Sequence, residues 1–375
     1  MENKVIRVAQ IIGKASEGGV EASVFNYFRN IDRDTIQYDF FVESTSKIIN
    51  REKIESMGGH VIIIPSIKHI FKYEKFLYEC FKREKYDIVH AHKSALNIFA
   101  LRAAKKAGIP VRISHAHSTS NKKEPIRHLA KNFLKLFSKK YATHYFACGE
   151  VAGRWLFGNK TFDEGKVTII NNGIYIDKFR YNATYRSQIQ TQYELAGKFV
   201  VGHVGRFVTQ KNHSFLLDIF YEIQKITPNS VLLLVGDGPL LDSTTEKALR
   251  LGIYDKVCFA GVHKHVFWYY NAMDCFLLPS LYEGLPVVGV EAQINGVPCF
   301  FSHNVTNEIA INDNSHIVPA EYDAKQWASF VVNNYKKASL ERADYALTFK
   351  NTKYDIVNES KRLLDLYESL LGVND

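Results

Sequence analysis

The sequence predicts an α/β fold made of two parallel-sheet halves, and three observations support this prediction. Apolar strand-like runs and helical stretches alternate along the whole chain, which is typical of a parallel sheet covered by helices on both faces. The pattern breaks near residues 172–180 and restarts at Phe199. The chain has 375 residues, which is enough for two domains with full cores.

In the first half, short apolar runs bounded by polar or turn residues predict strands. These strands cover residues 5–12, 38–42, 61–64, 87–90, 111–114, 145–147 and 167–171. Apolar residues at helical spacing predict helices over residues 21–30, 53–57, 70–82, 94–107 and 127–141. Strands and helices follow each other in turn, as in a doubly wound sheet.

The second half repeats this order. Its expected strands cover residues 199–204, 230–235, 257–260, 275–278, 298–302 and 315–318. Its expected helices cover residues 213–226, 241–251, 265–272, 325–334 and 354–371, with another between Pro286 and Gly296. Because open α/β sheets bind ligands beyond the carboxyl ends of their strands, we expect two crevices that face each other as one interdomain cleft.

Composition narrows the class of protein. The hydrophobic fraction of 46% is ordinary for a soluble globular chain, and no apolar run approaches the ~18 residues that span a bilayer. The start has no signal-peptide layout, and the five cysteines have no metal-ligand or redox spacing. We therefore expect buried, reduced thiols in a cytoplasmic protein. The net charge of +9 favours anionic partners such as nucleotides, nucleic acid or lipid headgroups.

Two carboxylates, Glu283 and Glu291, flank the start of the helix that follows the strand over residues 275–278. Gly284 permits a tight turn before it, and Pro286 suits the first helical position. Free amides at a helix start attract an anion. Two acids beside such an anion should bind neutral hydroxyls, so the pattern suggests a sugar nucleotide, with Glu291 on the ribose and Glu283 on the donor sugar.

Two other interpretations of this pair are open. Glu283 and Glu291 could be surface acids, or they could be the acid/base pair of a glycosidase. A general acid needs a raised pKa, whereas helix-start amides and nearby cations should lower the pKa of both carboxyls. The glycosidase interpretation therefore fits poorly.

A pair of cations follows the first strand of the second half. Arg206 and Lys211 are five positions apart, which lets both side chains reach one point. An arginine offers a forked contact and a lysine a point charge, and together they would neutralise a departing diphosphate. The alternative is a solvated basic loop.

Histidines end two strands of the first half. His115 and His117 alternate, as do His90 and His92, so each pair should lie on one face of the sheet. Such histidines are often structural, and the functional alternative is contact with the transferred sugar or the acceptor. Gly18-Gly19 follows the first strand, where backbone amides can approach a phosphate or the acceptor, although no dinucleotide or Walker fingerprint is present.

The expected helix over residues 127–141 is amphipathic. One side is basic and carries Arg127, Lys131, Lys135 and Lys139. The other side is apolar and carries Ile126, Leu129, Phe133, Leu136 and Phe137. Such a helix suits an anionic membrane surface, or it packs on its own domain with a solvated basic face.

These motifs together resemble a known family. The segment from Glu283 to Glu291 resembles the paired-glutamate motif of family-4 retaining glycosyltransferases of the GT-B fold. Gly205-Arg206 with Lys211, the turn over residues 235–238 and the segment 171–174 match the same family. Further stretches at residues 18–21, 25–32, 112–117 and 154–158 are similar to EpsF-like bacterial exopolysaccharide glycosyltransferases, so the resemblance covers nearly the whole chain.

The resemblance implies a fold and an activity. The fold is two Rossmann-like domains facing across a cleft: residues 1–178 bind the acceptor, residues 179–353 bind the nucleotide sugar, and residues 354–375 form a helix that packs back on the first domain. The implied reaction moves a hexose-type sugar from a nucleotide donor, expected to be a UDP-sugar, to a hydroxyl of a lipid-linked exopolysaccharide, capsule or O-antigen glycan. It proceeds with retention and needs no metal or other cofactor. The protein would be cytoplasmic or peripheral at the inner face of the membrane.

The resemblance also implies residue roles. Arg206 and Lys211 bind the diphosphate, Glu283 and the amides after it hold the donor sugar, and backbone near Val262 holds the base. The implied donor site comprises Gly18, Gly19, Gly205, Arg206, Lys211, Gly236, Asp237, Val262, Glu283, Gly284, Leu285, Pro286 and Glu291. The wider family has one histidine after this strand, whereas this chain has two, of which His117 is preferred over His115 at the reaction centre. Residues 305–308 replace two glycines that the wider family often carries.

Two rival functions remain. The same scaffold could hydrolyse or epimerise a UDP-sugar without an acceptor. A non-catalytic protein that binds an anionic ligand would also explain the charge. Nucleic acid is not an expected partner, because the basic residues form no recognisable binding motif.

Overall fold

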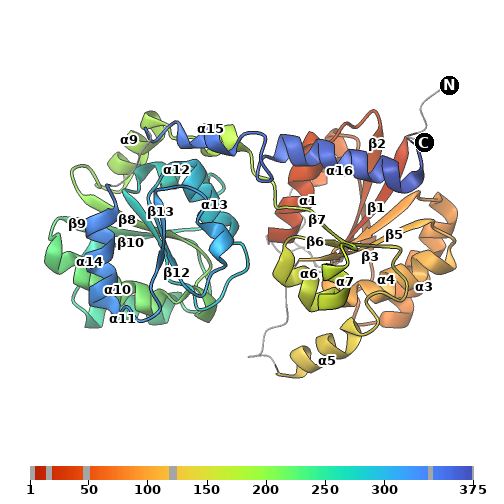
Figure 1. Cartoon of the computed structure of the whole chain (residues 1–375), viewed down its shortest axis with the longest axis horizontal. Coiled ribbons are helices and arrows are strands. Elements are labelled where there is room, and N and C mark those ends of the chain that lie inside the picture. Colours follow the sequence, from red (N-terminus) through yellow and green to blue (C-terminus); the bar gives the residue numbers. More distant parts are fainter. Residues whose placement is uncertain (1–4, 14–18, 45–50, 118–124, 337–340, 374–375) are drawn as a thin grey trace. The chain divides into compact units, whose positions relative to one another are not determined.

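The computed structural model describes residues 5–13, 19–44, 51–117, 125–336 and 341–373, and it contains two α/β units (Figure 1). The first unit comprises Met1–Ile174 and Asn351–Asp375, and the second comprises Tyr175–Lys350. Each unit has its own parallel sheet and its own core. The α/β prediction is therefore correct for both halves.

The first unit is built on a seven-stranded parallel sheet in the order β3-β2-β1-β4-β5-β6-β7. The strands are β1 (Ile6–Gly13), β2 (Ile36–Glu43), β3 (His60–Ile64), β4 (Ile88–Ala91), β5 (Val111–Ala116), β6 (His144–Ala147) and β7 (Val167–Ile169). The helices are α1 (Gly19–Asn30), α2 (Arg51–Ser56), α3 (Ile70–Glu84), η1 (Ser94–Leu96), α4 (Asn97–Lys106), α5 (Pro125–Lys135), α6 (Glu150–Phe157), α7 (Asn159–Asp163) and α16 (Ile356–Leu371). The strand order reverses direction between β1 and β4, and ligands bind at such a switch point.

The helix α3 shows how the sequence specifies this packing. It buries Tyr73, Leu77, Cys80 and Phe81, which recur at the spacing of one helix face. These side chains join a core that includes Phe41 of the sheet. Burying one such large apolar side chain contributes about 1.5–3 kcal/mol. The helix ends where Lys85 adopts the left-handed conformation, with φ of 51°.

The C-terminal helix α16 belongs to the first unit, and Figure 1 shows it running beside α1. Backbone bonds join Ile174 to Tyr354 (2.8 Å) and Ile356 to Ile174 (3.1 Å) at its start. Glu359 is buried and accepts hydrogen bonds from the backbone and side chain of Asn171. These bonds fix α16 against the end of β7.

The second unit has a six-stranded parallel sheet in the order β10-β9-β8-β11-β12-β13. The strands are β8 (Phe199–Val204), β9 (Ser230–Val235), β10 (Val257–Gly261), β11 (Cys275–Leu278), β12 (Cys299–Ser302) and β13 (Ser315–Val318). The helices are α8 (Ile176–Phe179), α9 (Ala183–Gln192), η2 (Thr209–Lys211), α10 (His213–Ile226), α11 (Leu241–Arg250), η3 (Tyr254–Lys256), α12 (Val266–Ala272), α13 (Val287–Ile294), η4 (Asn307–Ile309), α14 (Ala324–Asn334) and α15 (Tyr345–Phe349). The switch point lies between β8 and β11.

One expected helix is too long. The prediction of a helix over residues 127–141 is wrong after Lys135, where α5 ends and tight turns follow. The Ser138 hydroxyl donates to the carbonyl of Leu156 at 3.0 Å and is buried, which draws the chain towards α6. Lys139 is therefore not on the helix.

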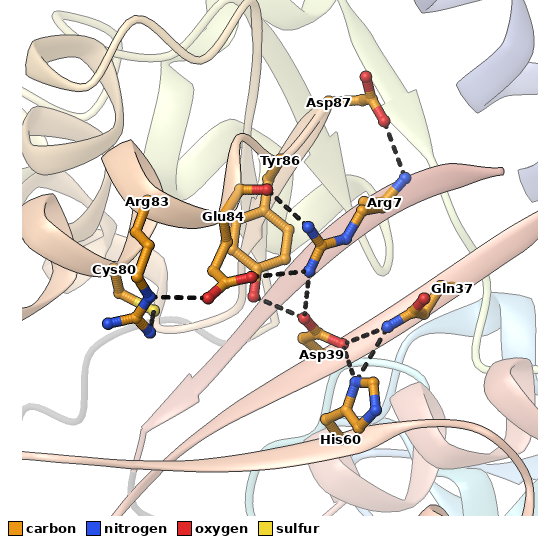
Figure 2. A network of polar contacts seen from close by, with 9 residues as sticks. All are labelled: Arg7, Gln37, Asp39, His60, Cys80, Arg83, Glu84, Tyr86 and Asp87. Atoms are coloured by element: carbon orange, nitrogen blue, oxygen red, sulfur yellow. Dashed lines mark hydrogen bonds and ion pairs between the residues drawn. The ribbon is translucent and has the colours of Figure 1, made fainter. Parts of the chain in front are cut away.

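A polar network lies toward the amino ends of the first sheet, away from the strand ends that bind ligands (Figure 2). Arg7 is the second residue of β1 and donates to Asp39 at 3.4 Å, and its backbone amide donates to Asp87 at 2.9 Å. The Tyr86 hydroxyl donates to the buried Asp39 at 2.6 Å, and His60 contacts the other carboxylate oxygen at 2.9 Å. The network joins β1, β2, β3 and the segment before β4, so its role is structural.

All five cysteines are free thiols, as expected. Burial raises the pKa of the Cys148 and Cys258 thiols to about 11, so both stay protonated at neutral pH. Within the described ranges, no helix combines the length and apolarity that crossing a bilayer requires.

Candidate functional site

The switch point of the second unit holds an ion pair between two of the predicted residues. Lys211 Nζ lies 2.7 Å from Glu283 Oε1, with side chains only 15% and 10% exposed. Ser280 Oγ donates to the same carboxylate oxygen at 3.1 Å. The structure therefore brings together a cation expected to bind phosphate and an acid expected to bind sugar, one after β8 and the other after β11.

Hydrogen bonds tie the two loops that carry this pair. The backbone amide of Leu281 donates to the carbonyl of Gln210 at 2.8 Å, and the Gln210 side chain donates to the carbonyl of Tyr282 at 3.0 Å. Asn212 donates to the carbonyl of Pro279 at 3.2 Å. Lys211 and Glu283 are thus held on loops that fix each other, which preorganises the site.

The glycine turns after β8 and β9 interlock. Gly236 has φ of 143°, and a Cβ built on it would lie 2.1 Å from the carbonyl oxygen of Gly205. The amide of Phe207 donates to the carbonyl of Asp237 at 3.0 Å. Only glycine allows this approach, which places the Gly205-Arg206 turn against the Gly236-Asp237 turn.

Arg206 is exposed, and its guanidinium forms no hydrogen bond or ion pair with any residue in the described ranges. Asp237 is also exposed, and its carboxylate accepts the amide of Gly238 at 2.7 Å. Val262 follows β10 and is 67% exposed, and β10 is tied to the neighbouring turn by a bond from Gly236 to Gly261 (2.8 Å). These positions lie at the carboxyl ends of three neighbouring strands, β8, β9 and β10.

The start of α13 differs in detail from the prediction. Pro286 is the N-cap and not the first helical residue. Gly284 is exposed, it is not among the glycines with positive φ, and a Cβ on it would meet nothing within 4 Å. The turn therefore does not require glycine at this position. Leu285 is half-buried, and Val305 pairs with Glu283 through a backbone bridge.

Glu291 contradicts the expected pKa shift. Burial raises its pKa to about 7, although a hydrogen bond from Tyr270 (2.8 Å) and the charge of Lys178 act in the opposite direction. The helix-start field falls off within the first turn, and Glu291 is the fifth residue of α13. Desolvation therefore dominates, and Glu291 titrates near neutral pH. The pKa argument against a glycosidase acid does not hold for Glu291.

Four histidines gather at the ends of β4 and β5 in the first unit. His90 Nε2 lies 2.9 Å from His115 Nδ1, and His92 Nδ1 lies 2.8 Å from His117 Nε2. The rings of His115 and His117 stack with centroids 3.9 Å apart. Burial lowers the pKa of all four, for His117 to about 3, so they are neutral at physiological pH. His117 is half-buried, whereas the other three are buried.

The same histidines include one candidate metal site. Nitrogen atoms of His90, His92 and His115 lie within 4.8 Å of one another. Hydrogen bonds between the imidazoles, and to Gln10 and Tyr367, already engage these rings. Those hydrogen bonds explain why the three imidazoles lie together without a metal ion.

The remaining predicted positions are less informative. Gly18 lies outside the described residues, and Gly19 is the first residue of α1, which follows β1 at the switch point. A buried ion pair after β4, where Lys93 Nζ lies 2.7 Å from Glu43 Oε1, was not predicted from the sequence. The contacts of Tyr270, Ser280 and Tyr367 were not predicted either. Ser280 precedes Glu283 by three positions and could have been found from that spacing, but the others are long-range partners.

The helix α5 does not match the expected division into a packed apolar face and a solvated basic face. Leu129 and Phe133 on α5, and Leu136 directly after it, are 73%, 60% and 70% exposed. Lys139 donates to the Thr161 hydroxyl at 2.9 Å, and Lys135 lies 5.6 Å from the ring centre of Trp155. Lys131 is half-buried, and the side chains of Ile126 and Arg127 lie outside the described residues. The apolar side chains, and not the lysines alone, form the open surface.

Comparison with known families gives two matches. Residues 198–336 match the family described as Glycosyl transferases group 1, and residues 17–178 match Glycosyltransferase Family 4. "Putative glycosyltransferase EpsF" of Bacillus subtilis is 33% identical over 318 residues, which is 82% of each chain. The UDP-Gal:alpha-D-GlcNAc-diphosphoundecaprenol alpha-1,3-galactosyltransferase of Escherichia coli is 30% identical over 72% of this chain and 68% of its own length.

Solved structures share the fold. HepE of Anabaena, crystallised with UDP-glucose, gives a TM-score of 0.79 at 17% identity and covers 97% of this chain and 100% of its own. WaaG, a glycosyltransferase involved in lipopolysaccharide biosynthesis, gives a TM-score of 0.74 at 14% identity, with 96% and 99% covered. At these identities the likeness shows the fold alone.

Proposed function

The chain belongs to the family-4, group-1 glycosyltransferases of the GT-B fold, and from this we propose that it moves a hexose-type sugar from a UDP-sugar to a lipid-linked glycan with retention and without a metal. The observation that carries the proposal is the arrangement at the switch point of the second unit. There Arg206, which has no side-chain partner among the described residues, and the Lys211–Glu283 pair follow neighbouring strands. Two cations suit a diphosphate, and an acid suits sugar hydroxyls.

The similar proteins support the choice of substrates. The Escherichia coli relative uses UDP-Gal and a diphosphoundecaprenol-linked acceptor. HepE has been crystallised with UDP-glucose, and EpsF is also named a glycosyltransferase. A uridine nucleotide and a lipid-linked sugar are therefore the substrate classes that we propose.

In the proposed reaction, the acceptor hydroxyl attacks the anomeric carbon from the face that the diphosphate leaves. The bond from carbon to the phosphate oxygen breaks, the bond to the acceptor oxygen forms, and the acceptor proton passes to the departing phosphate oxygen. Arg206 and Lys211 stabilise the charge that develops on the diphosphate, which is the role a metal would otherwise have. Glu283 and the backbone amides of Gly284 and Leu285 hold the donor sugar, and Glu291 holds the ribose.

The first unit is assigned to the acceptor side, through His115, His117 and the Gly18-Gly19 turn. His117 is the preferred histidine at the reaction centre, because it is the most exposed of the four. Its pKa is lowered to about 3 by burial, so it acts as a neutral hydrogen-bonding group and not as a cationic acid.

The test of the proposal is a donor panel read out by nucleotide release, with and without a lipid-linked oligosaccharide and with EDTA as the metal control. Turnover should require the acceptor and survive EDTA. Arg206→Ala should lower kcat by about 10²–10³, as is typical when one such electrostatic contact is lost. Arg250→Ala on α11 is the matched control and should leave kcat unchanged. Rapid turnover without acceptor would instead identify a hydrolase or epimerase, and an unchanged Arg206→Ala enzyme would refute the role of Arg206.

A lipid-linked acceptor also gives the exposed face of α5 a role. We place this surface, formed by Leu129 and Phe133 of α5 and by Leu136 directly after it, on the inner surface of an anionic membrane, where apolar side chains enter the interface and nearby cations meet the headgroups. Replacing the three apolar residues with serine should reduce sedimentation with anionic vesicles at least tenfold. Binding that persists in this triple variant would remove the membrane role from α5.

A further inference from the structure

A single chain of hydrogen bonds runs through the first unit and joins His117 to His115 by way of the C-terminal helix. Its contacts measure 2.8 Å, 2.7 Å, 3.4 Å, 2.6 Å and 2.9 Å in order. The groups that it connects are His117, His92, Gln10, Tyr367, His90 and His115. The two ends are neighbours, since the rings of His115 and His117 stack.

Between Gln10 and His117, the carbonyl oxygen of Gln10 decides which group donates and which accepts in each hydrogen bond. Its Oε1 faces His92 Nε2 at 2.7 Å, and a carbonyl oxygen only accepts, so His92 carries its proton on Nε2. The imidazole is neutral because burial lowers its pKa, and its Nδ1 is therefore a lone pair. His117 Nε2–H donates to that lone pair. The Nδ1 atom of His117 is then unprotonated and can only accept a hydrogen bond.

Between Gln10 and His115, the amide nitrogen of Gln10 decides which group donates and which accepts. Gln10 Nε2 donates to the oxygen of Tyr367, so the Tyr367 hydroxyl proton is directed to His90 Nδ1 at 2.6 Å. His90 then carries its proton on Nε2 and donates to His115 Nδ1 at 2.9 Å. The proton of His115 is left on Nε2. Among the described residues this atom has no hydrogen-bond partner, although it is buried.

One amide orientation thus decides four tautomers. With Gln10 as placed, all four histidines carry their proton on Nε2. Turning the amide over would reverse every bond and place every proton on Nδ1. The two arrangements are mutually exclusive, so a measurement of the tautomers decides between them.

The groups of the chain line a small cavity in the first unit. Its volume of about 10 Å³, counted over the positions that the centre of a water molecule can take, leaves room for about one water or one hydroxyl group. His115 Nε2 is buried without a partner among the described residues, and its side chain lines this cavity. A buried donor without an acceptor is unfavourable, which favours an occupant that accepts a hydrogen bond.

We propose that Gln10 and Tyr367 are positioning residues that fix His117 and His115 in opposite roles. His117 presents a lone pair, and His115 presents an N–H to the occupant of the cavity. A hydroxyl group suits both, because it donates to the first and accepts from the second. The identification of that hydroxyl as one of a sugar rests on the proposed function, whereas the direction of the chain does not.

The tautomers are measured on the full-length protein labelled with ¹⁵N-histidine, by long-range ¹H–¹⁵N correlation. The wild-type protein should show Nε2–H for His90, His92, His115 and His117. Signals of Nδ1–H tautomers at these four positions would overturn the proposal. This spectrum needs no variant and no substrate, so it decides the direction of the chain even if no sugar-transfer activity is found.

Tyr367→Phe then tests the link through α16. His90 and His115 should lose their single tautomer, while His92 and His117 keep theirs because Gln10 Oε1 still accepts. The matched control is Tyr86→Phe, which removes a buried hydroxyl of the same unit whose hydrogen bond goes to Asp39, in the network of Figure 2 and not in the histidine chain. It should leave all four tautomers unchanged. A Tyr367→Phe spectrum identical to wild type would overturn the role of Tyr367.

Activity provides the second readout. In the acceptor-dependent assay, Tyr367→Phe should lower kcat about tenfold while the KM for the donor stays within about twofold, because the nucleotide site is in the other unit. A loss confined to thermal stability, with kcat unchanged, would show a merely structural tyrosine. Circular dichroism of each variant establishes that the fold is retained.

Discussion

Replacing Glu291 by glutamine should remove a pH dependence from the binding of a UDP-sugar. Burial raises the pKa of this carboxyl to about 7, and its Oε2 accepts a hydrogen bond from Tyr270. Under the proposed assignment of Glu291 to the ribose, the ribose hydroxyls donate to the ionised carboxylate. The affinity of the wild-type protein should therefore rise with pH through neutrality.

The magnitude follows from that pKa. The ionised fraction of Glu291 rises from about 0.1 at pH 6 to about 0.9 at pH 8, so the apparent Kd should fall about tenfold over this range. Glu291→Gln should bind more weakly than wild type at pH 6 and should not improve at pH 8. Glutamine still accepts the bond from Tyr270, so the local structure is kept.

Isothermal titration calorimetry with UDP-glucose at pH 6, 7 and 8 measures this effect. A UDP-sugar is preferred to UDP, because a terminal phosphate itself titrates near pH ~6. Glu246→Gln, on the exposed surface of α11, is the matched control and should retain the tenfold change. A wild-type Kd that is constant from pH 6 to 8, or a Gln variant that keeps the slope, would refute the assignment of Glu291 to the ribose.

The same shift predicts a stability effect with a definite sign. The folded-state pKa lies above the ordinary value of 4.5, so between pH 4.5 and 7 the folded chain holds a proton that the unfolded chain has released. This carboxyl therefore lowers the free energy of unfolding as pH rises through that window, by at most about 3 kcal/mol. Glu291→Gln should be more stable than wild type at pH 8 and equal to it near pH 4.5, as measured by urea denaturation.

Two further predictions concern the fold that supports the site. Gly236→Ala should lower the free energy of unfolding by about 1–3 kcal/mol, because its Cβ would meet the carbonyl of Gly205, whereas Gly149→Ala, with open space around it, should change it by less than about 0.5 kcal/mol. Equal values for the two variants in urea denaturation would contradict the interlocked turns. Asp39→Asn should lower stability by about 1–3 kcal/mol at pH 7, because Arg7 and Tyr86 lose a charged acceptor. A denaturation curve that matches wild type would show that the network in Figure 2 contributes nothing.

The sequence determined the two α/β halves and most of the helices and strands, because apolar periodicity and turn residues are local signals. The same signals placed Arg206, Lys211 and Glu283 after strands, and parallel topology brings strand ends to one edge of a sheet. The ion pair between Lys211 and Glu283 follows from that topology. From the sequence, Lys211 was assigned to the diphosphate and Glu283 to the donor sugar, and an ion pair between them was not predicted.

Other features required the tertiary structure. The helix expected over residues 127–141 ends at Lys135, because Ser138 finds a partner in Leu156, which is distant in sequence. The pKa of Glu291 was expected to fall and instead rises, because desolvation depends on the surrounding packing and not on the position of a residue in a helix. Local spacing carries no information about either effect.

The four histidines show most clearly which features follow from the sequence and which follow from the tertiary structure. Their alternate spacing, at His90 and His92 and at His115 and His117, predicted two pairs that share a face of the sheet. That the pairs form one hydrogen-bonded chain depends on Gln10 from β1 and Tyr367 from α16, which lies 357 positions further along the sequence. The sequence determined which residues stand at the strand ends. Only the tertiary structure decided their partners, because hydrogen bonds between distant segments form only when the fold brings those segments together.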